Sequence, residues 1–418
     1  MISQAGSGYG LFDVVGIELE YVVVDEDLKP RCLLEDAFRG VHGHPTSEIQ
    51  RGDIGFSNEL AAHVFEIKNR EPQGSLAVAE AQLVEGLGFF AEVLRERFGA
   101  RLLPTGMHPF MRPSDTKLWQ RANRAIYETY ARIFSIQAHG WLNVQASHVN
   151  LPFGSEAETV LLHNATACLL PYLPALAASS PVYEGEIGPS VDNRLEFYKT
   201  NQRAIPVITG RVIPEYITSY ADYRRNVFRP IRESLDGHLG ADRLRPEWVN
   251  SRGAIMRFSR RALEIKVLDV QECVKADIAI AVFIRGALRY LTRRLRAGTL
   301  RLPEHGMLVE DLDSVIRDGT QARVHAAHLR PPSMKELGST TARSVLGDLL
   351  EQVPAEIAAD ELPYLTLVAD RIQRGSLSER IRYRLSKRTG RGVALPLAIR
   401  EVYTELMNCL QRNSPWPD

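Results

Sequence analysis

The chain has 418 residues, of which 44% are hydrophobic, so it can bury a large core in one large domain or in several smaller ones. Lysine plus arginine equals aspartate plus glutamate at 51 each, which excludes an overall field that attracts nucleic acid or an anionic membrane. The first ten residues lack the regions of a signal peptide, and no apolar stretch is long enough for a membrane span. We therefore expect a cytoplasmic protein that binds small molecules rather than nucleic acid or membranes.

Apolar periodicity predicts strands at 12–24, 62–69, 101–105, 141–151 and 255–270, and helices at 75–98, 115–135, 156–178 and 274–297. This spacing favours a mixed α+β fold over regular βαβ repeats. Beyond residue 300, amphipathic helices are predicted within 312–316, 343–353, 355–374 and 397–410. We predict a core over residues 1–300 and a helical layer over residues 301–418 that packs on the same core.

The first strand contains two glutamates separated by one residue, in the segment GIELEY. Because side chains alternate along a strand, Glu18 and Glu20 share one face while Ile17, Leu19 and Tyr21 take the other. Two like charges on a largely apolar strand repel each other and lose hydration, so a cation such as Mg²⁺ is expected between them. The alternative is a solvated strand face with chance glutamates.

Glu59 and Glu66 lie seven residues apart, which puts them on opposite faces of an unbroken strand. Either a turn or bulge lies between them, or one of them points away. Taken alone, each reads as an ordinary carboxylate in a salt bridge.

A basic cluster accompanies an acid in the segment 253–273. Alternation places Glu264 and Lys266 on one strand face, shortly after Arg257 and Arg260. Carboxylates that take a cation beside groups that neutralise phosphate suit a metal-bound triphosphate, and a surface ion-pair ladder is the alternative. The chain has no P-loop, dinucleotide fingerprint or nucleophile elbow, so phosphate binding would depend on metal ions with Arg and Lys.

Two further polar groups are candidates for ligand contact. His148 and Asn150 share one strand face and could serve as a metal ligand and a substrate hydrogen-bonder, or form a satisfied polar pair. His108 and Arg112 lie in a Pro-marked loop and could face a ligand from there.

Taken in order, these segments resemble the glutamate–cysteine ligase type 2 family of carboxylate–amine ligases, over roughly residues 12–290. The resemblance rests on GIELEYVVVD, Glu59 and Glu66, PTGMHPF, QASHVNLPF, ASSPVYEG and RGAIMRFSRRALEIKVLDVQEC. It implies a glutamine-synthetase-like catalytic domain, in which a curved, mainly antiparallel sheet flanked by helices holds ATP and Mg²⁺ or Mn²⁺. It also implies an ATP-dependent ligase that forms γ-glutamylcysteine through an acyl phosphate. Another amino acid, amine or peptide as acceptor, or a silent metal- or nucleotide-binding protein, remains as an alternative.

The resemblance also implies roles for individual residues. Metal-binding acids fall on Glu18, Glu20, Glu59, Glu66 and Glu264, catalytic cations on Arg257, Lys266 and Arg194, and cofactor contacts on His148, Asn150, Arg257 and Lys266. The family spacing indicates a break between Glu59 and Glu66. Many members have His-Val-His-Val-Gly where this chain has His148-Val149-Asn150-Leu151-Pro152, and Arg where it has Lys266, so a different substrate pocket is expected. Small amino-acid substrates are the expected partners, and a homo-oligomer is left open.

Overall fold

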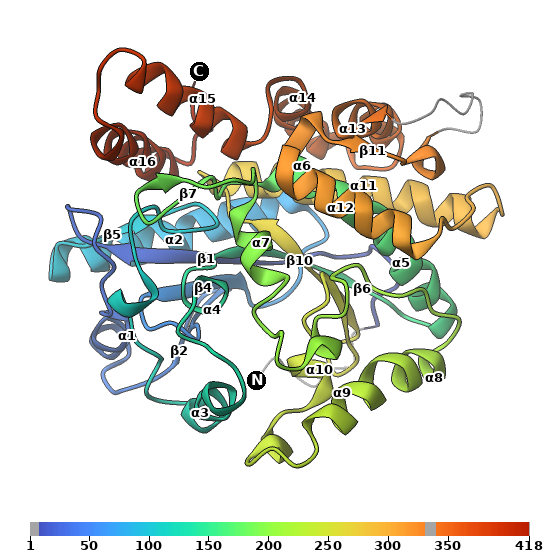
Figure 1. Cartoon of the computed structure of the whole chain (residues 1–418), viewed down its shortest axis with the longest axis horizontal. Helices are drawn as coiled ribbons and strands as arrows, with labels where there is room; N and C mark the ends of the chain where they lie inside the picture. Colours follow the sequence, from blue (N-terminus) through green and yellow to red (C-terminus); the bar gives the residue numbers. More distant parts are fainter. Residues whose placement is uncertain (1–7, 331–339, 418) are drawn as a thin grey trace.

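The computed structural model describes residues 8–330 and 340–417. Its centre is an eight-stranded sheet in the order β2-β3-β4-β1-β6-β10-β9, with β5 also paired to β1. All the pairings are antiparallel, and helices flank the sheet (Figure 1), which confirms the predicted α+β class. The strands are β1 (Gly16–Val24), β2 (Glu48–Arg51), β3 (Ile54–Asn58), β4 (Val64–Asn69), β5 (Arg101–Leu103), β6 (Ala146–Pro152), β9 (Ala254–Arg257) and β10 (Ala262–Asp269).

Two small two-stranded sheets lie outside this sheet, namely β7 (Val182–Tyr183) with β8 (Glu186–Ile187), and β11 (Arg323–Val324) with β12 (Thr340–Thr341). The helices before residue 300 are α1 (Leu34–His42), α2 (Leu76–Phe98), α3 (Arg124–Ile133), α4 (His139–Leu142), α5 (Glu156–Leu169), α6 (Pro174–Ala177), α7 (Asn193–Tyr198), α8 (Tyr220–Tyr223), α9 (Arg229–Leu235), α10 (Pro246–Val249) and α11 (Val274–Arg296). Those after it are α12 (His305–Asp318), α13 (Ala342–Leu350), α14 (Leu365–Arg374), α15 (Leu377–Thr389) and α16 (Leu395–Arg412). None of the helices in the described ranges is long and apolar enough to cross a membrane.

The two faces of β1 join different hydrophobic clusters. Ile17, Leu19 and Tyr21 belong to the main core, together with buried residues of α2 and α11. Val22 and Val24, on the same face as Glu18 and Glu20, belong to a second cluster that α15 and α16 complete. One face of β1 is therefore apolar throughout, whereas the other changes from acidic to apolar along the strand.

The helices beyond residue 300 fall into two groups. Buried residues of α12, α13 and α14 join the main core, as does Leu410 of α16, while the other buried apolar residues of α15 and α16 form the second cluster above the end of β1. Figure 1 shows this division along the upper edge of the molecule. The domain boundary at residue 300 stays a prediction.

Several predicted elements differ from the observed ones for local reasons. The helix expected at 115–135 is reduced to α3, which begins after Asn123 in a left-handed conformation with φ of 67°. The strand expected at 255–270 is a hairpin of β9 and β10, with Arg261 in the turn at φ of 51°. Helix α15 was not predicted because few of its residues are apolar, although Leu377, Ile381 and Leu385 repeat every four positions and are buried.

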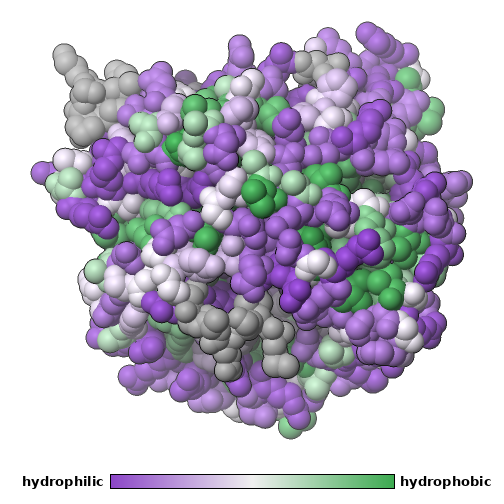
Figure 2. All heavy atoms as spheres, turned by 180° about the vertical axis from the view of Figure 1, so that it is seen from behind, coloured by the Kyte–Doolittle hydropathy of each residue, from purple (hydrophilic) through white to green (hydrophobic). Residues whose placement is uncertain are grey.

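Seen from behind, the surface is mainly hydrophilic, with hydrophobic side chains gathered toward the right of the view (Figure 2). A cavity of about 650 Å³ lies between α2, β5 and α16, and its walls include Leu87, Leu102 and Met407. None of the glutamates discussed above lines it. This cavity is therefore separate from the acidic face of β1.

Candidate active site

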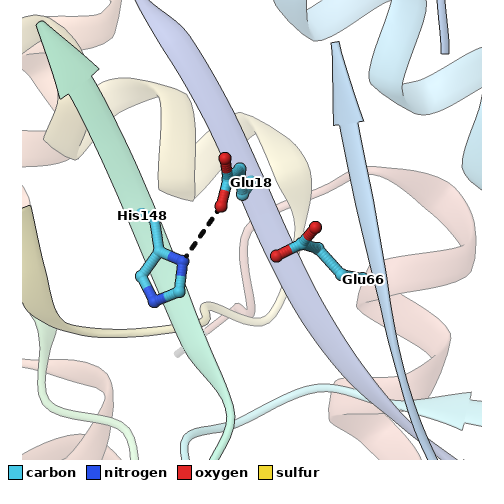
Figure 3. Close-up of side chains that lie close together, drawn as sticks. All are labelled: Glu18, Glu66 and His148. Atoms are coloured by element: carbon cyan, nitrogen blue, oxygen red, sulfur yellow. Dashed lines mark hydrogen bonds and ion pairs between the residues drawn. The ribbon is translucent and has the colours of Figure 1, made fainter. Parts of the chain in front are cut away.

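An acidic cluster lies on the face of the sheet that β1 shares with β4 and β6. The pairing of β1 with β4 places Glu20 opposite Glu66 and Glu18 opposite Lys68, and the pairing with β6 places Glu18 opposite His148. Residues directly opposite each other in antiparallel strands have neighbouring side chains. Figure 3 shows Glu18 and Glu66 on adjacent strands and the His148 ring turned toward Glu18.

The connection from β3 to β4 brings Glu59 to the same cluster. Strand β3 ends at Asn58 and β4 begins at Val64, so the predicted break between Glu59 and Glu66 is confirmed. The backbone N–H of Glu59 donates to the Val64 carbonyl at 3.3 Å, which closes the turn. Carboxylate oxygens of Glu20, Glu59 and Glu66 consequently lie within 4.8 Å of one another. We call these three residues the first ligand group.

A second ligand group consists of Glu18, Glu66 and His148, whose ligand atoms also lie within 4.8 Å of one another. Glu66 is common to both groups. Nδ1 of His148 lies 3.3 Å from Oε2 of Glu18, and the Asn150 amide donates to Glu18 Oε1 at 3.4 Å. The register of β1 with β4 and β6 therefore brings Glu18, Glu66 and His148 together.

Positive charge is distributed unevenly over these carboxylates. Glu66 accepts from Lys68 Nζ at 2.6 Å, whereas the hydrogen bond described for Glu20 is from the backbone N–H of Ala146 at 2.7 Å. Burial and the charges of Glu20 and Glu66 raise the pKa of Glu59 well above its usual value, and burial likewise raises the pKa of Glu20. Burial opposes ionisation of Glu18, but its contacts with His148 outweigh burial and lower its pKa to about 2.

The first ligand group fits a divalent cation. Its members are three carboxylates, the oxygen ligands that Mg²⁺ prefers, and two of them have raised pKa values because burial disfavours their charged forms. A bound cation would remove the repulsion that burial enforces. The assignment of these residues as metal ligands is developed below as a proposal.

Glu264 has a different environment from the other acids. It is 2% exposed and accepts from Arg257 Nε at 2.5 Å, Arg257 Nη2 at 3.2 Å and Lys266 Nζ at 2.6 Å. Although burial disfavours its charge, Lys266 and Arg257 hold the pKa of Glu264 well below its usual value. Neither ligand group contains Glu264. Its role as a metal ligand stays a prediction, and in this structure it holds two cations in place.

Lys266 joins this ion-pair cluster to the acidic one. A register shift between Ile265 and Leu268 marks a bulge in β10, and Lys266 lies within it. Its Nζ lies 3.2 Å from Nε2 of His148. His148 thus lies between Glu18 on one side and Lys266 on the other.

Arg194 lies deeper than the sequence suggests. It is 2% exposed, its guanidinium pairs with Asp269, and its Nη2 donates to the Lys266 carbonyl at 3.3 Å. These contacts anchor the backbone of β10 behind Lys266. Contact of Arg194 with a substrate stays a prediction.

The idea that His108 faces a ligand from its loop is wrong. The His108 side chain is fully buried, Nε2 lies 2.6 Å from the Leu28 carbonyl, and Nδ1 accepts from the N–H groups of Phe110 and Met111 at 3.0 and 2.9 Å. Both ring nitrogens are used by the backbone, so His108 shapes its own loop.

Lys68 and Trp248 are two residues near the acidic cluster and the ion-pair cluster that were not predicted from the sequence. Lys68 follows Glu66 by two residues in FEIKN, and this spacing alone places both on one strand face. Trp248 on α10 is 48% exposed and carries the guanidinium carbons of Arg257 and Arg260 at 4.8 and 5.3 Å from its ring centroid. No local pattern around Trp248 shows that α10 lies against the β9–β10 hairpin.

Known proteins similar to this chain include three with near-complete alignments. An uncharacterized protein of Archaeoglobus fulgidus is 38% identical over 400 residues, covering 96% of this chain and 99% of that protein. A candidate glutamate–cysteine ligase 2 of Paracoccus denitrificans is 25% identical over 408 residues, covering 96% and 98%. The crystal structure of the glutamate–cysteine ligase of Francisella tularensis in complex with AMP has a TM-score of 0.60 at 13% identity, covering 95% of this chain and 89% of that chain.

A bifunctional glutathione synthetase of Pasteurella multocida has a TM-score of 0.56 at 14% identity, and the match covers 95% of this chain and 52% of that longer chain. At such identities the two structures support the fold alone. The profile of glutamate–cysteine ligase family 2 matches residues 14–396, nearly the whole chain. The chain belongs to glutamate–cysteine ligase family 2, a family of ATP-dependent ligases.

Proposed function

We propose that this protein uses ATP to activate the γ-carboxylate of glutamate as an acyl phosphate and joins it to the amine of cysteine, forming γ-glutamylcysteine. The observation that carries the proposal is a gradient of charge across one sheet face. The half on β4 and β1 has more acids, with Lys68 among Glu18, Glu20 and Glu66, and the half on β10 and β9 has more cations, with Glu264 between Arg257 and Lys266. The exposed indole of Trp248 lies at the far edge. A metal-bound nucleotide has the same order of parts: cation, phosphates and base.

The acidic half of this face supports binding of Mg²⁺ or Mn²⁺ through Glu20, Glu59 and Glu66. A bound ion would supply neutralisation of the β- and γ-phosphates during transfer. Glu20 and Glu66 are 8% and 6% exposed, so their side chains are held by packing and present their oxygens in fixed positions.

The basic half supports binding of the phosphates. Lys266 and Arg257 are held by Glu264, and Arg260 Nη1 lies 3.5 Å from Glu18 Oε1. In a P-loop protein the backbone N–H groups of a glycine-rich loop bind the phosphates, and here these three cations would bind them instead. The indole of Trp248 offers an exposed aromatic face on which a purine can stack.

The proposed reaction has two steps. An oxygen of the donor carboxylate bonds to the γ-phosphorus while the bond to the bridging oxygen breaks, which releases ADP. The acceptor amine then bonds to the acyl carbon, loses a proton, and displaces phosphate. Lys266 and Arg257 are positioned to offset the negative charge of the transferring group.

Glutamate and cysteine as substrates are supported by the names of the Paracoccus relative and of the family. Asn150 and Lys266 depart from the family pattern and lie beside Glu18 and His148. A lysine donates to one point rather than as a planar fork, so a different acceptor is the second candidate function.

The test is a phosphate-release screen of the purified protein with Mg²⁺, ATP and pairs of amino acids, followed by product mass. We expect release with glutamate and cysteine, and ADP as the nucleotide product. Donor carboxylate labelled with ¹⁸O should transfer one labelled oxygen to the phosphate. Formation of AMP and pyrophosphate would exclude the acyl phosphate, and no release with any acceptor would favour a silent nucleotide-binding protein.

A further inference from the structure

A second cavity, of about 460 Å³, lies between the C-terminal end of α11, the first half of α12 and the segment 325–330. Neither ligand group contributes to its walls, and neither Arg257 nor Lys266 lines it. Its volume falls in the range of sites that hold small organic ligands, about 300–1,000 Å³. The charged side chains that line it, beside His325, are Arg294, Arg301, Arg330 and Asp311.

Arg294 brings a buried positive charge to this cavity. It is 7% exposed, and its Nη1 and Nη2 donate only to backbone carbonyls, those of His328, Leu329 and Thr299, at 3.2, 3.3 and 2.9 Å. In the part of the chain that the structure describes, its buried Nε has no hydrogen-bond partner. A buried donor without an acceptor is unfavourable, so an acceptor from outside the chain is expected at this atom.

His325 is oriented toward its role by a buried acid. Asp311 is 1% exposed, and its Oδ1 lies 2.8 Å from His325 Nδ1 while its Oδ2 accepts from the Tyr172 hydroxyl at 2.6 Å. Because a carboxylate accepts hydrogen bonds, the ring proton lies on Nδ1. Nε2 is thereby left for a ligand, and the side chain of His325 is 48% exposed.

The two other arginines give the cavity an excess of positive charge. Within residues 8–330 and 340–417, the exposed side chain of Arg301 has no hydrogen-bond or ion-pair partner. Arg330 is held from outside the cavity, because its Nη2 donates to Thr340 Oγ1 at 2.8 Å and its Nε lies 3.3 Å from Asp348 Oδ2. Since Asp311 is the one carboxylate in the lining, the cavity attracts anions.

The rest of the lining is largely apolar. It includes Leu302, Pro303, Met307 and Leu308, and Leu302 is 39% exposed. Inorganic anions make no use of such a surface, whereas an organic acid can bury its body against it. The combination therefore favours a ligand with an acidic head and a short apolar body.

We propose that this cavity is a second ligand site, which binds a small organic acid through its phosphate or carboxylate head. Arg294 Nε and the Arg301 guanidinium donate to the head, since guanidinium groups match the oxygens of both kinds of acid. A protonated His325 also donates to it through Nε2 and keeps its bond to the buried acid. The inference does not depend on the proposed function, because the cavity lies apart from the acidic face.

The experiment titrates the full-length protein with phenyl phosphate, benzoate and benzyl alcohol, which share a phenyl ring and differ in the head. Nuclear magnetic resonance of the ring protons measures the bound fraction of each compound in the same way. A non-hydrolysable ATP analogue with Mg²⁺ is present throughout, so that the nucleotide face is occupied. We expect an acid to bind and the alcohol not to bind. Binding of phenyl phosphate alone would identify a phosphate ester, and binding of benzoate alone a carboxylic acid.

Three variants locate the bound acid. Arg301→Gln and His325→Gln should each raise its dissociation constant about ten-fold, because each removes one hydrogen bond to the head. Arg323→Gln is the matched control, since Arg323 is exposed and lies two residues from His325 but does not line the cavity, and it should bind as the wild type does. Circular dichroism and thermal unfolding of each variant establish that it is folded.

Three results would overturn the inference. They are no binding of either acid, equal affinity for benzyl alcohol and the acids, and unchanged affinity for the acid in both folded Arg301→Gln and His325→Gln. Each of them leaves the proposed function standing, because none of these residues takes part in it.

Discussion

Arg257 and Glu264 form a buried pair across the β9–β10 hairpin, in which Nε and Nη2 of the guanidinium reach the two carboxylate oxygens at 2.5 and 3.2 Å. Lys266 donates to the same carboxylate at 2.6 Å. One buried acid thus compensates two cations. Glu264 consequently differs from Glu20, which lies on the same sheet face without such partners.

Replacing Glu264 by Gln should destabilise the fold as well as reduce turnover. The change leaves Arg257 and Lys266 with an uncompensated charge in a buried place, which costs about 3 kcal/mol. Urea unfolding should show a lower midpoint with an unchanged slope. An unchanged midpoint would contradict the compensating role of Glu264.

Replacing Glu20 by Gln should have the opposite effect on stability. Burial raises the pKa of Glu20, so the folded state favours its neutral form, and Gln imitates that form while it can still accept from Ala146. We expect a gain of stability in EDTA and a loss of turnover of about 10². Thermal unfolding with EDTA and with Mg²⁺ measures both states, and Mg²⁺ should raise the melting temperature of the wild type more than that of the variant. A variant less stable than the wild type in EDTA would refute this account.

Removing the indole of Trp248 should weaken ATP binding. Stacking on an aromatic side chain contributes about 1–3 kcal/mol per base, so Trp248→Ala should raise the dissociation constant about ten-fold. Trp248 is 48% exposed whereas Trp119 and Trp416 are 2% and 3% exposed, so quenching of tryptophan fluorescence by ATP should disappear in Trp248→Phe. Trp416→Phe serves as the control and should keep the quenching. If Trp248→Ala bound ATP as tightly as the wild type, and Trp248→Phe kept the quenching as Trp416→Phe does, the base would bind elsewhere.

The stability should fall at acid pH partly because of His108. Burial lowers its pKa from the ordinary 6.5 to about 4, and protonation would turn Nδ1 into a donor that faces two N–H groups. Since the folded-state pKa is depressed, the stabilisation is full above about pH 6.5 and is lost as the pH falls through about 4. Each such proton contributes a slope of about 1.4 kcal/mol per pH unit in this window.

The measurement is the free energy of unfolding as a function of pH for the wild type and His108→Gln. Between pH 6.5 and about 4, the free energy of unfolding of the variant should depend less steeply on pH, by about 1.4 kcal/mol per pH unit, which is the contribution of one proton. His44→Gln, at an exposed position, is the matched control and should follow the wild type. Parallel curves for His108→Gln and the wild type would refute the assignment.

Strand alternation was sufficient to place Glu18 with Glu20, and His148 with Asn150, because a period of two depends only on local backbone geometry. The fold class followed from element spacing, and the family profile and the antiparallel sheet confirm it. Burial of Arg194 against Asp269, and the indole of Trp248 above Arg257, depend on contacts between distant segments, which no local pattern carries. Strands β2 and β3 were missed because they are short, and three of the four residues of β2 are exposed.

The second hydrophobic cluster has a consequence for the order of folding. Val22 and Val24 continue the acidic face of β1, yet α15 and α16, which cover them, come from the opposite end of the described chain. During synthesis, the strands that carry Glu18, Glu66 and His148 emerge long before that cover exists. Closing so long a stretch of chain is slow, so the nascent protein presents a paired acidic strand with a bare apolar end.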